Sequence, residues 1–153
     1  MSEDDINLGE LDNMIGVELR IAQILADKTF SASQGAKIPS GHFTVLSLID
    51  LNAGINQSML ARCMYLDRST MVPILDQLES KGWMERCKKP GDRRSYALYL
   101  TQQGKNVLKE AGTRVRELEA NLAEKMGPQK RDQLLSLTKE LQRALLALID
   151  KEN

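Results

Sequence analysis

One short stretch of the chain gathers positive charge around a turn. Lys88 and Lys89 precede the turn Pro90-Gly91-Asp92, and Arg93 and Arg94 follow it. Lysine and arginine side chains bind phosphate oxygens through charge-assisted hydrogen bonds. The cluster stands out because the whole chain is formally neutral, with 21 Lys+Arg and 21 Asp+Glu. The stretch therefore indicates either a solvated loop or a surface that binds a polyanion.

The charge is distributed unevenly along the chain. Residues 1–30 carry seven acidic and two basic side chains, whereas residues 52–100 carry eight basic and five acidic ones. The middle of the chain is therefore its positive part, and the acidic N-terminal segment balances it.

Residues suited to catalysis are scarce. His42 is the single histidine, and Cys63 and Cys87 form no CxxC pair. The chain also lacks a GxGxxG loop, a P-loop and an HExxH motif. We therefore expect no enzymatic activity, no metal and no cofactor. The two thiols are expected to be incidental, with Cys63 a small core residue of a helix and Cys87 a strand residue.

The composition is ordinary for a globular protein, at 42% hydrophobic and 27% charged residues. No segment approaches the run of about 18 apolar residues that spans a membrane. The acidic start Met1-Ser2-Glu3-Asp4-Asp5 differs from the basic start of a signal peptide. We therefore expect a cytoplasmic protein with no membrane partner.

The charged turn is flanked by two expected strands and preceded by two short helices. Residues 83–87 and 95–100 have strand patterns on either side of the turn. Asn56 is a good N-cap for a helix over residues 57–64, and Asp67 is one for a second helix that ends near Gly82. Two short helices followed by a hairpin form the pattern of a winged helix-turn-helix. The second helix has an apolar face of Met71, Ile74, Leu75 and Leu78. The residues left outward are Arg68, Ser69, Val72, Pro73 and Asp76.

Longer helices are expected on both sides of this module. Apolar residues from Leu8 to Ala26 recur at helical spacing, and a loop at 31–35 ends that helix. Residues 42–49 fit a helix with His42, Val45, Leu46 and Ile49 on one stripe, although their β-branched content keeps a strand possible. Thr101 caps a long helix, which Gly127-Pro128 separates from a last one. The expected fold class is mainly α with a small β-hairpin, a winged helix-turn-helix flanked by long N- and C-terminal helices.

An ordered series of motifs resembles the MarR family of winged-helix transcriptional regulators. In the wing, Asp92, Arg94, Leu98, Leu100 and Thr101 match the family pattern D-x-R-x-x-x-L-x-L-T without a gap. The resemblance covers about residues 40–104, and the flanking helices fit the family by length and order. The preceding motifs, in chain order, are Leu66-Asp67-Arg68-Ser69-Thr70, Leu75-Asp76-Gln77-Leu78-Glu79 and Lys81-Gly82-Trp83.

The resemblance implies a homodimeric repressor of transcription. Such a dimer binds a pseudo-palindromic double-stranded DNA operator with half-sites about 10 bp apart. A small organic effector, such as an aromatic acid or its coenzyme A thioester, would release it. The implied domains are an N-terminal dimerisation helix (1–36), a winged helix-turn-helix DNA-binding domain (37–101) and C-terminal helices that complete the dimerisation domain (102–153). A ligand-independent architectural DNA-binding protein is the alternative.

Particular residues are expected to contact DNA or effector. Arg94 matches the family arginine that enters the minor groove, and Asp92 shapes the wing turn. Arg20 and His42 are candidate partners of an anionic effector because each lies on or beside an apolar helical stripe; a surface arginine and a helix-end histidine are the alternative interpretation. No cysteine precedes Cys63, which argues against the family's redox-sensing branch. The other expected DNA contacts are Arg68, Ser69, Thr70, Val72, Pro73, Lys88, Lys89 and Arg93.

Two residues depart from the family pattern. The ring of Pro73 should clash with the carbonyl of Ser69, which predicts a kink or a later start of the second helix. Tyr65 stands in a turn where the family often has glycine, which leaves the conformation of that turn open.

Overall fold

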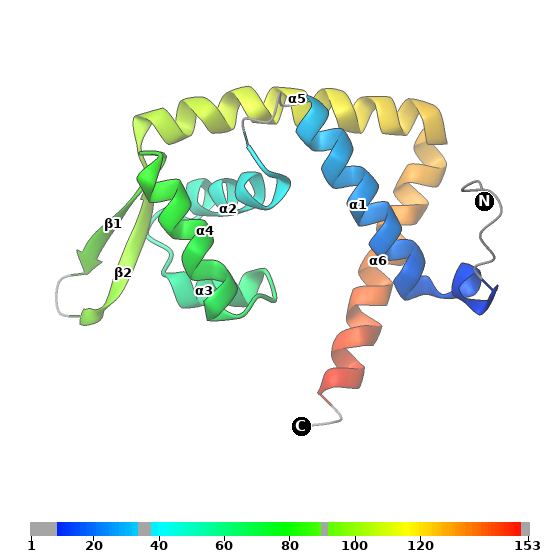
Figure 1. The fold of residues 1–153 in the computed structure, drawn as a ribbon, viewed down its shortest axis with the longest axis horizontal. Helices are drawn as coiled ribbons and strands as arrows, with labels where there is room; N and C mark the ends of the chain where they lie inside the picture. The colour runs from blue at the N-terminus through cyan, green and yellow to red at the C-terminus, as the bar shows by residue number, and fades with distance from the viewer. Residues whose placement is uncertain (1–8, 34–37, 90–91, 151–153) are drawn as a thin grey trace. The chain divides into compact units, whose positions relative to one another are not determined.

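The computed structural model describes residues 9–33, 38–89 and 92–150, without the side chains of residues 89 and 92–95. The chain forms two compact units, residues 1–112 and 113–153. The expected fold class, mainly α with one β-hairpin, is confirmed (Figure 1). The elements are η2 (Gly9–Asn13), α1 (Ile15–Ser33), α2 (Ser40–Leu51), α3 (Gln57–Cys63), α4 (Arg68–Ser80), β1 (Met84–Lys89), β2 (Asp92–Leu100), α5 (Gln102–Met126) and α6 (Pro128–Ile149).

The core of the first unit lies where α2, α3, α4 and the hairpin meet. α2 is a helix, so the strand alternative for residues 42–49 is wrong, and its four stripe residues are all buried. Tertiary burial on one face stabilises this helix despite its β-branched residues. The largest fully buried side chains are Ile38, Val45, Leu46, Ile49, Leu60, Met71, Leu75, Leu78, Met84 and Leu98.

The first expected helix differs from the structure at both ends. A 3₁₀ helix, η2, precedes α1, so the N-terminal stripe is not one continuous α-helix. The two meet at Met14, whose N–H donates to the Leu11 carbonyl oxygen in the 3₁₀ pattern, while its own carbonyl oxygen accepts from the Glu18 N–H in the α-helical pattern. At the other end α1 continues to Ser33, so the predicted loop at residues 31–35 begins too early. Residues 34 and 35 lie outside the described residues.

Helices α3 and α4 begin where the capping residues predict. The Asn56 side chain accepts a hydrogen bond from the Met59 N–H at 2.8 Å, which confirms it as an N-cap. Asp67 occupies the N-cap position of α4, but its side chain makes no capping hydrogen bond. Its backbone carbonyl oxygen instead accepts bonds from the N–H groups of Thr70 and Met71. Pro73 lies inside α4, so the helix does not begin later than predicted.

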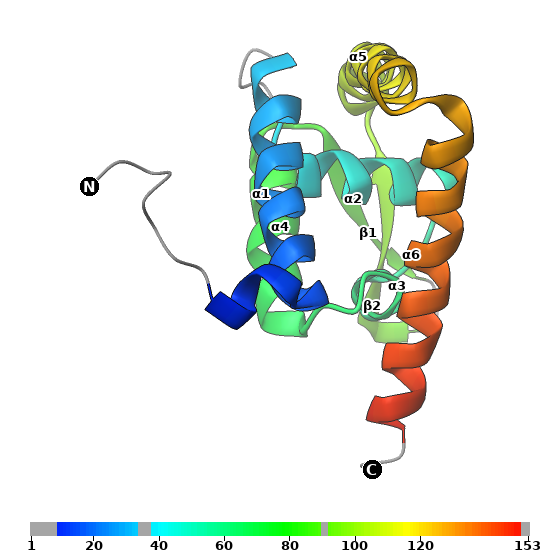
Figure 2. The same ribbon diagram turned by 90° about the vertical axis from the view of Figure 1, so that its right-hand side faces the viewer.

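The hairpin is longer than expected and is anchored at its base. β1 and β2 are antiparallel, with Met84 paired to Leu100 and Cys87 paired to Ala97. Leu98 also exchanges backbone hydrogen bonds of 2.9 Å with the turn between α2 and α3, and β2 lies beside α2 (Figure 2). The predicted turn at Pro90-Gly91 lies outside the described residues. These contacts hold the base of the wing to the rest of the first unit.

The start of α5 is fastened to the end of α4. Thr101 is confirmed as a cap, because its Oγ1 accepts from the Gly104 N–H at 3.0 Å and donates to the Gly82 carbonyl oxygen at 2.6 Å. The Thr101 N–H donates to the Trp83 carbonyl oxygen at 3.1 Å. A Cβ on Gly104 would lie 1.8 Å from that oxygen, so only glycine permits this approach.

In the second unit, α6 follows the last part of α5 after a one-residue break. Gly127 has φ +86° and Pro128 is the first residue of α6, so the predicted break is confirmed. The Nη2 of Arg131 lies 3.1 Å from the Oε2 of Glu119, and this ion pair links α6 to α5. Within the described residues, none of the helices combines the length and apolar character of a membrane-spanning segment.

Cys63 is exposed, so its expected place in the core is wrong. α3 buries only Leu60 and Ala61, while Met59, one turn before Cys63, is also exposed. Cys63 therefore shares the outer face of this short helix. Cys87 is a half-buried strand residue, as predicted.

Candidate nucleic-acid interface

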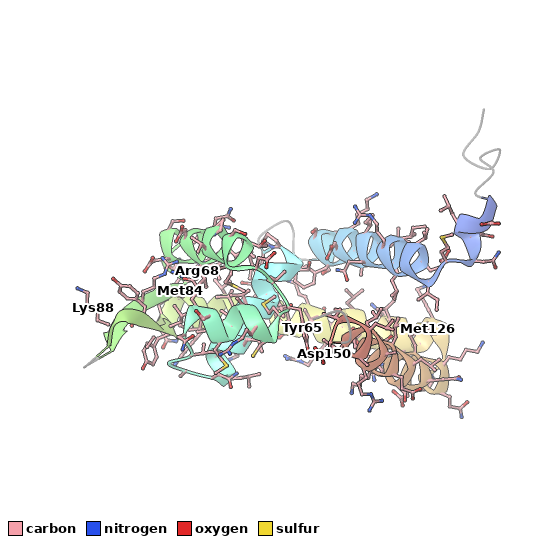
Figure 3. All side chains as sticks on the ribbon, turned by 90° about the horizontal axis from the view of Figure 1, so that it is seen from below. Tyr65, Arg68, Met84, Lys88, Met126 and Asp150 are labelled. Atoms are coloured by element: carbon pink, nitrogen blue, oxygen red, sulfur yellow. The ribbon has the colours of Figure 1, made fainter. Side chains whose placement is uncertain are left out.

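The first turn of α4 presents polar side chains to solvent. Arg68 (Figure 3), Ser69 and Thr70 are exposed. Among the described residues none forms a hydrogen bond or ion pair with the side chains of these three. Hydroxyl groups at the start of a helix can alternatively reinforce its cap, and the side chains of Ser69 and Thr70 make no such bond among the described residues. The N-terminus of a helix favours anions, and these side chains add donors for phosphate or base edges.

Farther along α4, the outward face becomes less polar. Pro73 is exposed and Val72 is half-buried, while Met71, Leu75 and Leu78 on the opposite face are buried in the core. The inward and outward faces expected from the sequence are thus the ones that the structure has, except that Ile74 is only half-buried.

The expected wing residues gather at the far end of the hairpin. Lys88 is exposed near the end of β1 (Figure 3). Lys89 is the last residue of β1, and its backbone pairs with Asp92 at the start of β2. Arg93 and Arg94 follow in β2, so the strands bring the backbones of these four residues to the tip of the hairpin. The side chains of Lys89, Asp92, Arg93 and Arg94 lie outside the described part.

Arg86 joins the wing to α4, a link that the sequence analysis missed. Its Nη2 lies 2.7 Å from the Asp76 Oδ1, and its Nη1 donates to the Glu79 carboxylate. Burial alone would lower the pKa of Arg86, but the hydrogen bonds and charges of Asp76 and Glu79 raise it. Arg86 therefore holds β1 against α4 and offsets two acidic charges beside the candidate interface. The i, i+3 spacing of the two carboxylates, which places them on one helix face, was the available signal.

The two candidate effector residues have different surroundings. Arg20 is exposed on α1, whereas His42 on α2 is only 7% exposed, and among the described residues none forms a hydrogen bond with its Nδ1. Burial, and then the positive charge of Lys81, lower the pKa of His42. No contact within the described residues joins the two side chains. A pocket of about 540 Å³ lies elsewhere, between the end of α2 and α3, and is lined by Leu48, Asn52, Ala53, Gly54, Ile55, Asn56, Met59 and Cys63.

Comparison with known proteins places this arrangement in a family. Residues 38–96 match the family model of MarR. A protein of Thauera aromatica, named as a transcriptional regulatory protein for the hcr operon, is 32% identical over 139 residues. That alignment covers 88% of this chain and 82% of the relative. The chain belongs to the MarR family.

Solved structures of MarR-family proteins share its fold. The transcriptional repressor CouR bound to a 23-mer DNA duplex is 34% identical, with a TM-score of 0.83, and the match covers 90% of this chain and 98% of CouR. CouR bound to p-coumaroyl-CoA is 31% identical, with a TM-score of 0.84, and the match covers 91% of this chain and 99% of CouR. The PcaV regulator of Streptomyces coelicolor, at 20% identity over 92% of this chain and 99% of PcaV, shares the fold with a TM-score of 0.83.

The MarR-family relatives named above are transcriptional regulators rather than enzymes. This chain is a DNA-binding transcriptional regulator with a winged helix-turn-helix. In such a module α4 is the recognition helix and the β1–β2 hairpin is the wing.

Proposed function

We propose that the protein is a homodimeric repressor that leaves a pseudo-palindromic operator when a small organic effector binds. The similarity to CouR carries this proposal, because it extends over nine-tenths of the chain and one CouR structure holds DNA while another holds p-coumaroyl-CoA. The proposed effector is therefore an aromatic acid or its coenzyme A thioester.

Exposed apolar side chains on the segment from η2 through α1 and on α5 and α6 support the homodimer. A globular monomer rarely leaves many large apolar side chains in water, and a second copy of the chain would cover them. In the proposed organisation, residues 1–36 and 102–153 form the dimerisation domain around the DNA-binding residues 37–101. The exposed residues are Leu11, Met14, Ile15, Leu19, Ile21, Ile24 and Leu25 in the first unit, and Leu122, Met126, Leu134, Leu135, Leu137, Leu145, Leu148 and Ile149 in the second.

The recognition helix and the wing would bind DNA in different ways. Arg68, Ser69 and Thr70 would bond phosphates or base edges, and Val72 with Pro73 would meet the apolar edge of the major groove, such as a thymine methyl group. At the tip, Lys88, Lys89 and Arg93 would bind phosphates, so the affinity should fall with salt. Arg94 would enter the minor groove, and Asp92 would shape the turn.

The proposed effector partners remain Arg20 and His42. Within the described part of the chain the buried Nδ1 of His42 has no hydrogen-bond partner, and a polar group of a ligand would satisfy it. An exposed arginine such as Arg20 is suited to a carboxylate or phosphate.

The test uses a DNA duplex that the unaltered protein selects from a random-sequence pool. Reversal of charge in Arg94→Glu should abolish retention of this duplex in a gel-shift assay, while sedimentation shows an unchanged dimer. Arg143→Glu makes the same charge change on an exposed residue of α6, outside the proposed DNA surface. With a dimer that sedimentation also shows to be intact, this variant should bind normally. Full retention of the duplex by Arg94→Glu would refute the proposed DNA surface.

The effector is tested on the same complex. Titration with aromatic acids and with p-coumaroyl-CoA should release the duplex at micromolar to millimolar ligand. Release by none of them would instead favour a ligand-independent architectural protein.

A further inference from the structure

The end of α3 places Tyr65 in a conformation that favours glycine. The Tyr65 N–H donates to the Arg62 carbonyl oxygen at 3.1 Å, and the Leu66 N–H donates to that of Ala61 at 3.0 Å. These two bonds form a Schellman motif, which requires a left-handed residue at the position of Tyr65. Tyr65 has φ +52° and is the only residue besides glycine with positive φ among the described residues.

The end of α4 has the same motif with glycine in that position. The Gly82 N–H donates to the Glu79 carbonyl oxygen at 2.8 Å, and the Trp83 N–H donates to that of Leu78 at 3.0 Å. Gly82 has φ +68°, which a residue without a Cβ adopts without strain. Formation of the helix end alone would therefore favour glycine at position 65 as well.

Packing does not account for the tyrosine ring. Tyr65 is 76% exposed, and within the described part of the chain no hydrogen bond or ring contact involves its side chain. By comparison, the hydroxyl of the less exposed Tyr99 lies against Gly54. An exposed aromatic residue on a strained backbone contributes little to the fold, which indicates a role in binding.

Tyr65 lies at the entrance to the recognition helix. It stands two residues before the N-cap Asp67 and three before the exposed Arg68 (Figure 3). Exposed Arg62 lies at the end of α3, on the other side of the turn. A phenol hydroxyl at this place can donate to a phosphate oxygen, and such contacts position a protein on its duplex.

We infer that Tyr65 is a DNA-contacting residue whose hydroxyl binds the sugar-phosphate backbone next to the recognition helix. This inference rests on the proposed DNA surface and adds to it a neutral residue that sets the position of α4 on the duplex.

The decisive variants separate folding from binding. Tyr65→Gly removes the ring and the backbone strain, so it should raise the midpoint of thermal unfolding by a few degrees while weakening binding to the selected duplex at least tenfold. Tyr65→Phe removes only the hydroxyl and should weaken binding about three- to tenfold, the range expected for one hydrogen bond. Leu51→Ala is the matched control, since Leu51 is 79% exposed, and its binding should be unchanged.

Fluorescence anisotropy at several salt concentrations gives the second readout. A neutral hydroxyl releases no counterion, so the dependence of log Kd on log salt should keep its slope in Tyr65→Phe. Equal affinity of the unaltered protein and both tyrosine variants would overturn the role of Tyr65 and leave the proposed function intact. Failure of the unaltered protein to select any duplex would overturn both.

Discussion

Replacement of Gly104 by alanine should destabilise the protein, although alanine is normally the better helix former. Gly104 is the third residue of α5, and an added Cβ would lie 1.8 Å from the Trp83 carbonyl oxygen, where ordinary contact begins at 3.4 Å. The obstacle is a backbone atom, which cannot rotate away as a side chain can. The start of α5 must therefore move by about 1.6 Å relative to Trp83, the difference between those two distances.

This displacement would disrupt two hydrogen bonds. They run from the Thr101 N–H to the Trp83 carbonyl oxygen at 3.1 Å and from the Thr101 Oγ1 to the Gly82 carbonyl oxygen at 2.6 Å. Each contributes about 1 kcal/mol, and the forced rearrangement of a packed site adds about 1–3 kcal/mol. The higher helix propensity of alanine stabilises the folded protein by at most about 1 kcal/mol. The free energy of unfolding should fall by about 2–4 kcal/mol, which for a chain of this size lowers the unfolding midpoint by roughly 4–16 °C.

Urea unfolding followed by circular dichroism measures the effect. One fixed protein concentration is needed because the unfolding of an oligomer depends on concentration. Gly41→Ala is the matched control, because Gly41 is also near a helix start but a Cβ there meets nothing within 4 Å. That variant should be unchanged or slightly stabilised. A Gly104→Ala protein as stable as the unaltered one would refute the close approach between α5 and Trp83.

Two further outcomes follow from charged and titratable groups. Arg86→Ala leaves the carboxylates of Asp76 and Glu79 unpaired beside the DNA surface, so its Kd for the selected duplex should rise about three- to tenfold. The protein should stay folded, because the partly exposed ion pairs contribute under about 1 kcal/mol to the free energy of unfolding. An unchanged Kd in a titration would contradict the linking role of Arg86. Because burial and Lys81 lower the pKa of His42 below its ordinary 6.5, the unfolded chain takes up the proton first as the pH falls. The free energy of unfolding should therefore decrease as the pH falls below 6.5, and His42→Gln should show a shallower decrease in urea titrations at pH 7 and pH 5.5. Equal slopes in the two proteins would exclude this contribution of His42.

Helix ends were predictable because their determinants are local. Asn56 and Thr101 bond N–H groups three residues ahead, and Gly82 and Gly127 adopt positive φ within the turns they form. Such interactions depend on the nearest few residues and are visible in a linear pattern. The ordered series of motifs indicated the family, whereas each motif alone would be weak evidence for it.

Asp67 and Cys63 show where local patterns fail. Asp67 occupies the cap position as predicted, but its side chain does not make the bond, because residue type establishes only that the bond is available. Cys63 is exposed because α3 is short and buries only two residues, and no pattern over seven residues defines a face reliably. The sequence shows Tyr65 at a turn position where glycine is common, but only the backbone shows its left-handed conformation.

The amino-acid sequence thus determined the helices, the hairpin, the charged tip and the family, since these depend on residue type and short-range spacing. It did not reveal contacts between residues distant in the chain, since no linear pattern records which surfaces meet. Arg86 pairs with Asp76 ten residues earlier, Thr101 bonds Gly82 nineteen residues earlier, and Gly104 meets Trp83 only after α5 packs on the end of α4. These contacts hold the recognition helix, the wing and the start of α5 together, and they exist only when the chain is folded.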